Sequence, residues 1–328
     1  MNNTTLKRIS QILEISISTV SRALKNHPDI SDKTKLRVIE LANAMDYEPN
    51  ANAINLRTSN SRLFGLIVPG ISNFFYDSFI ASVEEESRKN NYALMVLQSG
   101  DDPLMELNNL KLCRQNRVSG LFACISTQTT NYDPFLKLKD MKTPVIFFDK
   151  VPDNNGFNKV CVADTASANI AAVTLARKDK KKILAVFGDE RLLMTRKRLE
   201  AFKETSAKRN PSATITYGFA RNSQDAEGIT STYLAQKVDA VFCMSDEILT
   251  GAMRAIQKQH LRIPDEIGVI AISNGFIPRL FYPEITYVET SGHKLGKLAF
   301  SSMMACLAGS TFIQELTIES ILVEGGSL

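Results

Sequence analysis

Apolar residues recur at helical spacing in the first 47 residues of the chain and in strand-length runs after them. The helical stripes comprise Leu6, Ile9 and Leu13, then Val20 and Leu24, and then Leu36, Ile39 and Ala42. Ser16 and Ser31, which precede the second and third stripes, can accept hydrogen bonds from the free N–H groups of a first helical turn. The pattern predicts three short helices that share one small core.

A short polar segment separates this module from the rest of the chain. Pro49 ends the third helical pattern, and residues 50–58 (NANAINLRT) amount to about two helical turns. A segment so short and so rich in asparagine is not stable as a helix alone in water. We expect a hinge that becomes helical on contact with a partner.

From Leu63 onward, apolar runs alternate with amphipathic helical stretches, which is typical of parallel sheets covered by helices. The expected strands are residues 63–68, 92–97, 120–125, 144–148, 159–162, 183–187, 240–244 and 267–272. Because the pattern restarts after about residue 162, we expect two similar lobes. The predicted fold is a small all-α helix-turn-helix head followed by a two-lobed α/β body.

Charge is unevenly distributed along the chain. Residues 1–62 hold nine Lys or Arg and six Asp or Glu, so that this end carries three of the four net positive charges. A positive excess confined to one small module is compatible with a polyanionic partner, although a solvated helical surface could show the same count. Charge alone therefore does not decide the function.

Composition and motifs exclude several classes of protein. The chain has no stretch of eighteen or more apolar residues, and its polar, basic start is not an export signal, so we expect a cytoplasmic protein. The five cysteines lie far apart in or beside apolar runs, which predicts buried free thiols and no metal site. Phosphate-loop, dinucleotide-binding, zinc-protease and serine-hydrolase motifs are absent. We expect neither an enzyme nor a bound cofactor.

The segment from Leu6 to Arg22 (LKRISQILEISISTVSR) contains two short helical patterns with a tight turn near Glu14. Such a pair can place its second helix in a major groove of DNA. If Val20 and Leu24 face the core, then Arg22 faces outward and could bond a guanine edge bidentately. By pattern alone, Arg22 could equally be a solvated surface cation, and the neighbouring Ile17 could continue the core stripe.

These residues resemble the lactose-repressor (LacI/GalR) family of bacterial transcription regulators, and the resemblance runs from Thr5 to about Val323. The head, hinge and first strand carry it in TVSRAL (19–24), PDIS (28–31), TKLRVIELANAMDYEPN (34–50) and LRTSNSRLFGLIVPGISNFF (56–75). The body adds FCMSDEILTGAMRAI (242–256) and RIPDEIGVIAIS (262–273). The resemblance implies a body like that of periplasmic binding proteins.

The resemblance also implies a division of the chain. Residues 1–48 would be the DNA-binding head and residues 49–61 the hinge helix or linker. Residues 62–328 would be the ligand-sensing and dimerisation domain. Its N-lobe would take in about 62–162 and 292–322, and its C-lobe about 163–291.

Residues of the head match the family's DNA-contacting positions. The resemblance puts base reading on Ile17, Ser18 and Arg22, and a minor-groove wedge on Leu56, with Ala53 on the same hinge face. It puts phosphate contacts on Thr5, Ser16, Thr19, Ser21, Ser31, Thr34, Tyr47 and Asn50, and hydroxyls, amides and helix N-termini suit that role. Two residues depart from the family pattern: Glu14 replaces the usual turn glycine, and Ile54 replaces a residue that is often basic.

The resemblance further implies an effector cleft between the lobes, built from loops at strand ends. Its expected residues are Phe74, Phe75, Tyr76, Asp149, Asp164, Arg198, Asp246, Ser273 and Asn274. The cleft departs from sugar-binding members of the family. Ser273 and Asn274 stand where an aspartate pair is common, Met194 replaces a usual serine, and Ser223 stands where an aromatic ring often stacks on the ligand.

We therefore expect a ligand-responsive, sequence-specific transcription regulator, with a repressor controlled by a small sugar or sugar derivative as the leading form. Its partners would be double-stranded operator DNA of pseudo-palindromic sequence, the effector and a second copy of the chain. No heptad segment follows the last strand-like run, which favours a homodimer over a tetramer. The alternative is a soluble solute-binding or carbohydrate-processing protein with an unrelated small head.

Overall fold

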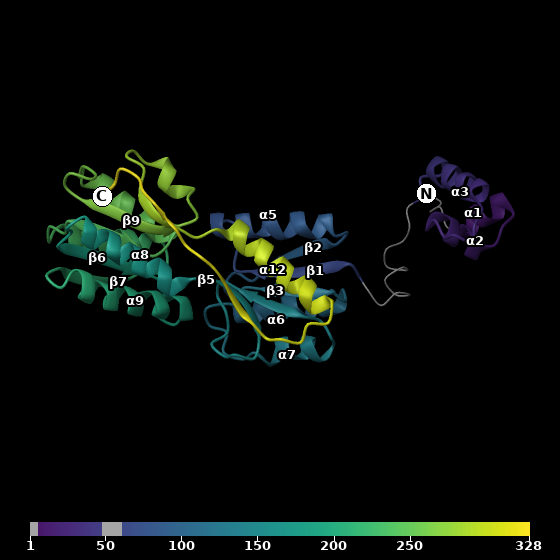
Figure 1. Cartoon of the computed structure of the whole chain (residues 1–328), viewed down its shortest axis with the longest axis horizontal. Coiled ribbons are helices and arrows are strands. Elements are labelled where there is room, and N and C mark those ends of the chain that lie inside the picture. Colours follow the sequence, from purple (N-terminus) through teal and green to yellow (C-terminus); the bar gives the residue numbers. More distant parts are fainter. Residues whose placement is uncertain (1–5, 48–60) are drawn as a thin grey trace. The chain divides into compact units, whose positions relative to one another are not determined.

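The computed structural model describes residues 6–47 and 61–328. The chain divides into two compact units, Met1–Ser61 and Arg62–Leu328, which we call the head and the body (Figure 1). Thr5, Asn50, Ala53 and Leu56, together with nearly all of the expected hinge, lie outside the described residues.

The head is a three-helix module. Its helices are α1 (Leu6–Leu13), α2 (Ile17–Leu24) and α3 (Asp32–Ala44). The helices bury a core made of Ile9, Val20, Ala23, Val38 and Ala42. The predicted caps are present: the hydroxyl oxygen of Ser16 accepts a hydrogen bond from the backbone N–H of Thr19, and that of Ser31 from Thr34. These caps fix the beginnings of α2 and α3.

The core stripe predicted for α3 was wrong in two of its three positions. Leu36 and Ile39 are exposed, whereas Val38 and Ala42 are buried and Leu41 and Met45 pack against them. Residues four apart share a helix face, so the face that carries positions 38 and 42 turns positions 36 and 39 toward solvent.

The first lobe of the body is a six-stranded sheet, and all of its strand pairs are parallel. In sheet order the strands are β11 (Glu315–Ile318), β5 (Asn158–Val162), β4 (Val145–Phe148), β3 (Gly120–Ala123), β1 (Leu63–Val68) and β2 (Ala93–Gln98). One apolar cluster packs this sheet on α5 (Phe74–Lys89) and α12 (Gly292–Leu307), which lie side by side (Figure 1). A second cluster packs it on α6 (Pro103–Gln115) and α7 (Asp133–Asp140).

The second lobe repeats this architecture. In sheet order its strands are β12 (Leu322–Val323), β10 (Thr286–Glu289), β9 (Gly268–Ser273), β8 (Ala240–Cys243), β6 (Lys182–Phe187) and β7 (Thr214–Phe219). Only the pairing of β10 with β12 is antiparallel. Its helices are α8 (Asp164–Arg177), α9 (Leu193–Arg209), α10 (Ser223–Leu234), α11 (Asp246–Lys258) and the 3-10 helix η1 (Ile277–Leu280). The predicted two-lobed α/β body with parallel sheets is confirmed.

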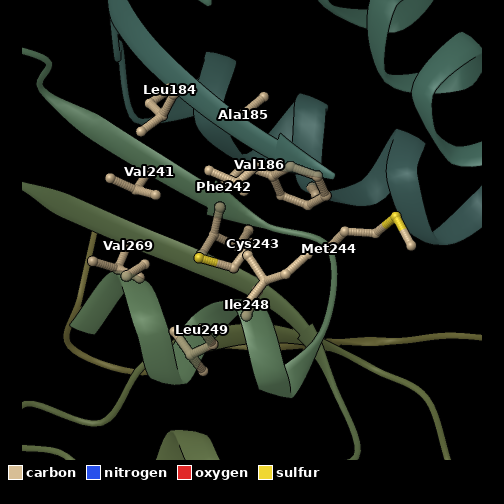
Figure 2. Packing of buried hydrophobic residues seen from close by; sticks show 14 of the residues in the cluster. Leu184, Ala185, Val186, Val241, Phe242, Cys243, Met244, Ile248, Leu249 and Val269 are labelled. Carbon is tan, nitrogen blue, oxygen red and sulfur yellow. The ribbon is translucent and has the colours of Figure 1, made fainter. Parts of the chain in front are cut away.

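The core of the second lobe holds the carboxyl ends of its central strands in place. Val241, Phe242 and Cys243 of β8 lie beside the β6 residues Leu184 to Val186, and Ile248 and Leu249 of α11 pack beneath them (Figure 2). These side chains are almost fully buried. The short loop of Met244 and Ser245 is therefore anchored on both sides, which places the polar start of α11 at the edge of the sheet.

Candidate functional site

The N-terminus of α2 presents a cluster of hydroxyl groups. The Ser16 hydroxyl lies 2.7 Å from that of Ser18 and 2.8 Å from that of Thr19. At α3, the Ser31 and Thr34 hydroxyls lie 2.9 Å apart. Free N–H groups and hydroxyls at a helix N-terminus are a favourable setting for a phosphate group.

The residues predicted to read bases lie on the outer side of α2. Ile17 and Ser18 are exposed at its first turn, and the Arg22 side chain is 58% exposed. Arg22 lies 3.9 Å from the carboxylate of the equally exposed Asp29, a weak ion pair that leaves the guanidinium accessible. Ile17 is not part of the head core, so this surface combines one apolar, one hydroxyl and one cationic side chain.

The turn between α1 and α2 keeps left-handed geometry without glycine. Glu14 has a φ of 54°, and the N–H of Ile15 donates to the carbonyl oxygen of Ser10. A residue with a Cβ pays about 1 to 2 kcal/mol for this conformation. The departure at Glu14 therefore costs the head some stability and leaves the turn geometry intact.

The other residues predicted to contact the DNA backbone differ in accessibility. Ser16 and Ser31 are exposed, whereas Thr19, Ser21, Thr34 and Tyr47 are half-buried. These residues remain predicted contacts.

The body contains a cavity of about 390 Å³ between its two lobes. It is lined by residues that follow the carboxyl ends of strands in both sheets, such as Tyr76 after β1, Asp149 after β4 and Asp246 after β8. Loops at the carboxyl ends of parallel strands are where α/β proteins bind ligands. A ligand here would contact both lobes at once.

The structure brings together most of the residues predicted for this cleft. Phe75, Tyr76, Asp149, Arg198, Asp246 and Ser273 line the cavity. Asp164, Phe74 and Asn274 are not among its lining residues.

Arg198 and Asp164 form a buried ion pair in the second lobe. The Nε of Arg198 donates to Oδ1 of Asp164 at 2.8 Å, and its Nη1 donates to the carbonyl oxygen of Met244 at 3.1 Å. Arg198 is only 4% exposed. Burial raises the pKa of Asp164, and the Arg198 guanidinium opposes this rise. Asp164 therefore orients Arg198 from behind and does not face the cavity.

The cations on either side of Arg198 are positioned differently. Arg196 donates to Asp153 at 2.7 Å and Lys197 to Glu315 at 3.1 Å. Both side chains are substantially exposed, and both pairs join the second lobe to the first. Of the three consecutive cations, Arg198 is the one that is buried against the cavity.

Phe74 and Asn274 lie at a different place on the boundary between the lobes. The Phe74 ring stacks on Phe276 with centroids 4.3 Å apart, and both residues line a separate, smaller hollow of about 280 Å³ together with Asn274. The Asn73 side chain caps α5 by accepting from the N–H of Phe75. This cap sets the first turn of α5, in which Phe75 and Tyr76 line the main cavity and Phe74 does not.

One wall of the cavity joins α5 to the loops that follow β3 and β4 through hydrogen bonds. The hydroxyl of the buried Tyr76 donates to Oδ2 of Asp149 at 2.6 Å, and the thiol of Cys124 lies 3.9 Å from the same oxygen. Asp149 has a left-handed φ of 56°. Burial, followed by the Asp149 charge, raises the pKa of Tyr76 well above its ordinary value, so the phenol stays a donor.

The opposite wall is an acceptor site on the second lobe. Asp246 accepts hydrogen bonds from the hydroxyl of Ser273 and from the backbone N–H of Asn274. Burial raises the pKa of Asp246, and these hydrogen bonds offset part of the rise. Ser273 and Asn274 stand where the family often has an aspartate pair. In this chain the carboxylate comes from Asp246, which follows β8, and Ser273 at the end of β9 holds it by a hydrogen bond.

Several polar residues that line the cavity were not predicted from the sequence. They are Asp101, Lys150, Asp189, Arg191, Arg221, Asn222 and Glu247. Hydrogen bonds from Arg191 lower the pKa of Asp189 to about 2. All of them follow strands or begin helices. Polar residues just after each apolar run in the sequence would therefore have indicated these cavity-lining positions.

Asp246→Asn tests the electrostatics of the cavity wall. A carboxyl whose pKa is raised by folding stabilises the fold at low pH and loses that contribution as the pH rises through the raised pKa. The amide can still accept from Asn274 and donate to Ser273. We therefore expect the variant to gain stability relative to the unaltered chain as the pH rises from about 4 to about 8, while ligand binding weakens. Denaturant unfolding across that range measures the difference, and a difference independent of pH would contradict it.

The described part of the chain does not provide a metal centre. Within residues 6–47 and 61–328, no group of three or more His, Cys, Asp or Glu side chains could hold an ion. Over the same ranges, none of the helices combines the length and apolar character that crossing a membrane requires.

Two family models match the chain. Residues 5–50 match the model described as "Bacterial regulatory proteins, lacI family", and residues 173–328 match "Periplasmic binding protein-like domain". The chain belongs to the LacI family of bacterial regulatory proteins. This LacI-family chain is a DNA-binding, ligand-responsive transcription regulator, and its relatives are regulators, not enzymes.

Relatives of similar length support this membership. The transcriptional regulator RegA of Clostridium acetobutylicum is 26% identical, over 91% of each chain. The ribose operon repressor of Haemophilus influenzae is also 26% identical, over 92% of this chain and 91% of its own.

Solved structures share the fold. The lac repressor dimer bound to operator and the anti-inducer ONPF superposes with a TM-score of 0.88 at 19% identity, covering 99% of each chain. A regulator from Alkaliphilus metalliredigens complexed with D-xylulofuranose gives 0.72 at 22% identity, over 81% of this chain and 98% of its own.

Proposed function

We propose that this regulator is a cytoplasmic homodimeric repressor whose two heads bind the half-sites of a pseudo-palindromic operator and whose bodies bind a small sugar-like effector. Ile17, Ser18 and Arg22 would read base edges, and the hydroxyls at the beginnings of α2 and α3 would bond phosphates. From the sequence alone, we further propose that residues 49–61 form the hinge and that Leu56 is its minor-groove wedge.

The cavity between the lobes is the observation that carries the ligand-responsive part of this proposal. Its walls include Tyr76 and Asp149 of the first lobe and Arg198 and Asp246 of the second. A ligand that bonds both walls binds one arrangement of the lobes more tightly than another, and this difference is what allows it to change DNA affinity.

The chemistry of the walls favours a ligand with several hydroxyl groups. Asp149 and Asp246 supply acceptors and Arg198 a charged donor, each held by a partner in the protein. The ribose operon repressor and the D-xylulofuranose complex among the related proteins agree with this class. Ser223 supplies no aromatic ring from the second lobe, so Phe75 and Tyr76 of the first lobe are the aromatic residues that line the cavity.

A ligand screen tests this proposal. Thermal unfolding should be measured with monosaccharides, sugar phosphates and nucleobases, because a ligand at 100 times its dissociation constant stabilises by about 2.7 kcal/mol. A hit should then change the affinity for DNA upstream of the protein's own gene, with binding that weakens steeply as salt rises. Stabilisation by nucleobases alone would exclude a sugar-like effector.

Arg22→Ala is expected to cost about 1 to 3 kcal/mol of discrimination between operator and unrelated DNA, because a bidentate base contact is lost. Lys25→Ala, which removes an exposed cation just after α2, is the matched control and should weaken both DNAs alike. Competition gel shifts measure the ratio. If the Arg22 variant discriminates between the two DNAs as well as the unaltered chain does, Arg22 is a surface cation and does not read a base.

A further inference from the structure

A second cavity of about 400 Å³ adjoins the first between the lobes of the body. The two share seven lining residues, among them Asp149, Lys150 and Arg191, so they are neighbouring compartments of one cleft. Each compartment alone lies at the lower end of the range of about 300–1,000 Å³ that encloses small-molecule ligands. We propose that the effector is a two-ring ligand whose second, hydroxylated ring occupies this second compartment.

Hydroxyl groups make up much of the second compartment's wall. Ser126, Thr129, Thr130 and Tyr132, on the loop that follows β3, line this compartment and not the first. Ser126 is buried, and its hydroxyl oxygen has no hydrogen-bond partner in the described part of the chain. A hydroxyl both donates and accepts, so this wall matches a ring that carries several hydroxyls of its own.

Glu106 of α6 holds this wall in place from behind. Its carboxylate accepts from the backbone N–H of Ser126 at 2.7 Å and from the hydroxyl of Thr129 at 2.8 Å. Glu106 is itself buried, at 1% exposure. A wall that is already ordered costs less conformational entropy when a ligand binds.

The charges around the second compartment favour a neutral ring over a phosphorylated one. Lys150 is paired with Asp101 at 2.8 Å, Arg191 with Asp189 at 2.6 Å, and Arg196 with Asp153 at 2.7 Å. Every cation that lines the compartment thus already has a carboxylate partner. A phosphate would have to displace one of these partners, whereas a hydroxylated ring would not.

Apolar surface from the second lobe completes the compartment. Leu193 and Met194, at the beginning of α9 in the second lobe, line this compartment, whereas the hydroxyl-bearing loop belongs to the first lobe. A sugar ring presents C–H groups on its faces and hydroxyls around its edge, which fits one apolar and one polar wall. The Arg196–Asp153 pair also joins the two lobes here, so a ring in this compartment lies beside a contact that opening of the lobes would break.

The inference rests on the sugar-like effector proposed above, and a paired ligand panel tests it. The probes are glucose with maltose, cellobiose and trehalose; galactose with lactose and melibiose; xylose with xylobiose; and glucose 6-phosphate. The full-length protein is titrated with each. We expect a disaccharide to bind at least about tenfold more tightly than either of its component rings.

Thr130→Trp isolates the second compartment. Thr130 is exposed and lies outside the first compartment, so the indole should fill the second one without disturbing the fold. We expect the disaccharide to lose its advantage and bind no better than the single ring, while operator binding stays unchanged. Thr311→Trp, which adds the same bulk at an exposed threonine that lines neither compartment, should bind as the unaltered chain does.

The outcomes separate the two proposals. If single sugars bind and no disaccharide binds more tightly than its component rings, the second compartment does not bind a ring. The same conclusion follows if Thr130→Trp binds the disaccharide as tightly as the unaltered chain does. If glucose 6-phosphate binds more tightly than every neutral sugar in the panel, the inference that the second ring is neutral is wrong. If no sugar of either size binds while operator DNA does, the sugar-like effector itself fails, and the two-ring inference fails with it.

Discussion

Arg198→Met is expected to lower the unfolding free energy of the body by about 3 to 5 kcal/mol and to abolish its response to the effector. The substitution leaves Asp164 in the protein interior without the guanidinium that bonds it at 2.8 Å. Urea unfolding of the full chain, followed by a probe in the body, measures the loss, and gel shifts with effector measure the response.

Two further variants separate stability from ligand binding. Arg209→Met removes an exposed cation in the last turn of the same helix and should change stability by less than about 1 kcal/mol. Combining Arg198→Met with Asp164→Asn removes the buried charge and should recover much of the stability, but not the response. If the Arg198→Met single variant is as stable as the unaltered chain, the buried Asp164 does not need Arg198 as a partner for the stability of the fold.

The sequence identified most strands whose runs are continuously apolar, including the exposed edge strand β2, and missed β7, β10, β11 and β12, in which polar residues interrupt the run or the strand is very short. The runs that became β1, β3, β4, β6, β8 and β9 are continuous and apolar, which is the pattern of a central parallel strand. β7, with the sequence TITYGF, lies at the edge of its sheet and is only half-buried. Its run mixes polar and apolar residues, so it carries no comparable signal, whereas the edge strand β2 (ALMVLQ) was predicted because its run is apolar.

The candidate cavity was predictable in outline because polar residues after parallel strands must gather at one edge of the sheet. Its details depended on side-chain direction and on distant partners. Phe74, Phe75 and Tyr76 are consecutive, yet helical geometry sends the first to the stack with Phe276 and the other two to the cavity. The pairing of Arg198 with Asp164, 34 residues away, becomes visible only in three dimensions.

Gly251→Ala is expected to destabilise the second lobe by about 1 to 3 kcal/mol or more, although alanine ordinarily stabilises a helix relative to glycine. Gly251 lies in α11 where this helix crosses α10, and a Cβ there would lie 2.1 Å from the carbonyl oxygen of Ser223 and 2.9 Å from the backbone nitrogen of Glu227. Backbone atoms cannot rotate away as a side chain can. The two helices must therefore move apart.

Gly228→Ala is the matched control, because Gly228 lies in the interior of α10 with nothing within 4 Å of the added Cβ. It should stabilise the lobe by about 0.5 to 1 kcal/mol through the lost freedom of the unfolded chain. Thermal unfolding of both variants gives the sign directly. A stabilised Gly251→Ala variant would show that α10 and α11 do not approach as closely as the structure has them.

The consequence of Gly251→Ala for ligand binding follows from where the two helices begin. Asn222, which caps α10, and Asp246 and Glu247, the first residues of α11, all line the cavity. Separating the helices displaces one of these polar groups relative to the others, so an effector loses affinity even though no residue that contacts it has changed. Gly228→Ala should bind the effector normally. Full effector affinity in a destabilised Gly251→Ala variant would place the ligand contacts on the first lobe instead.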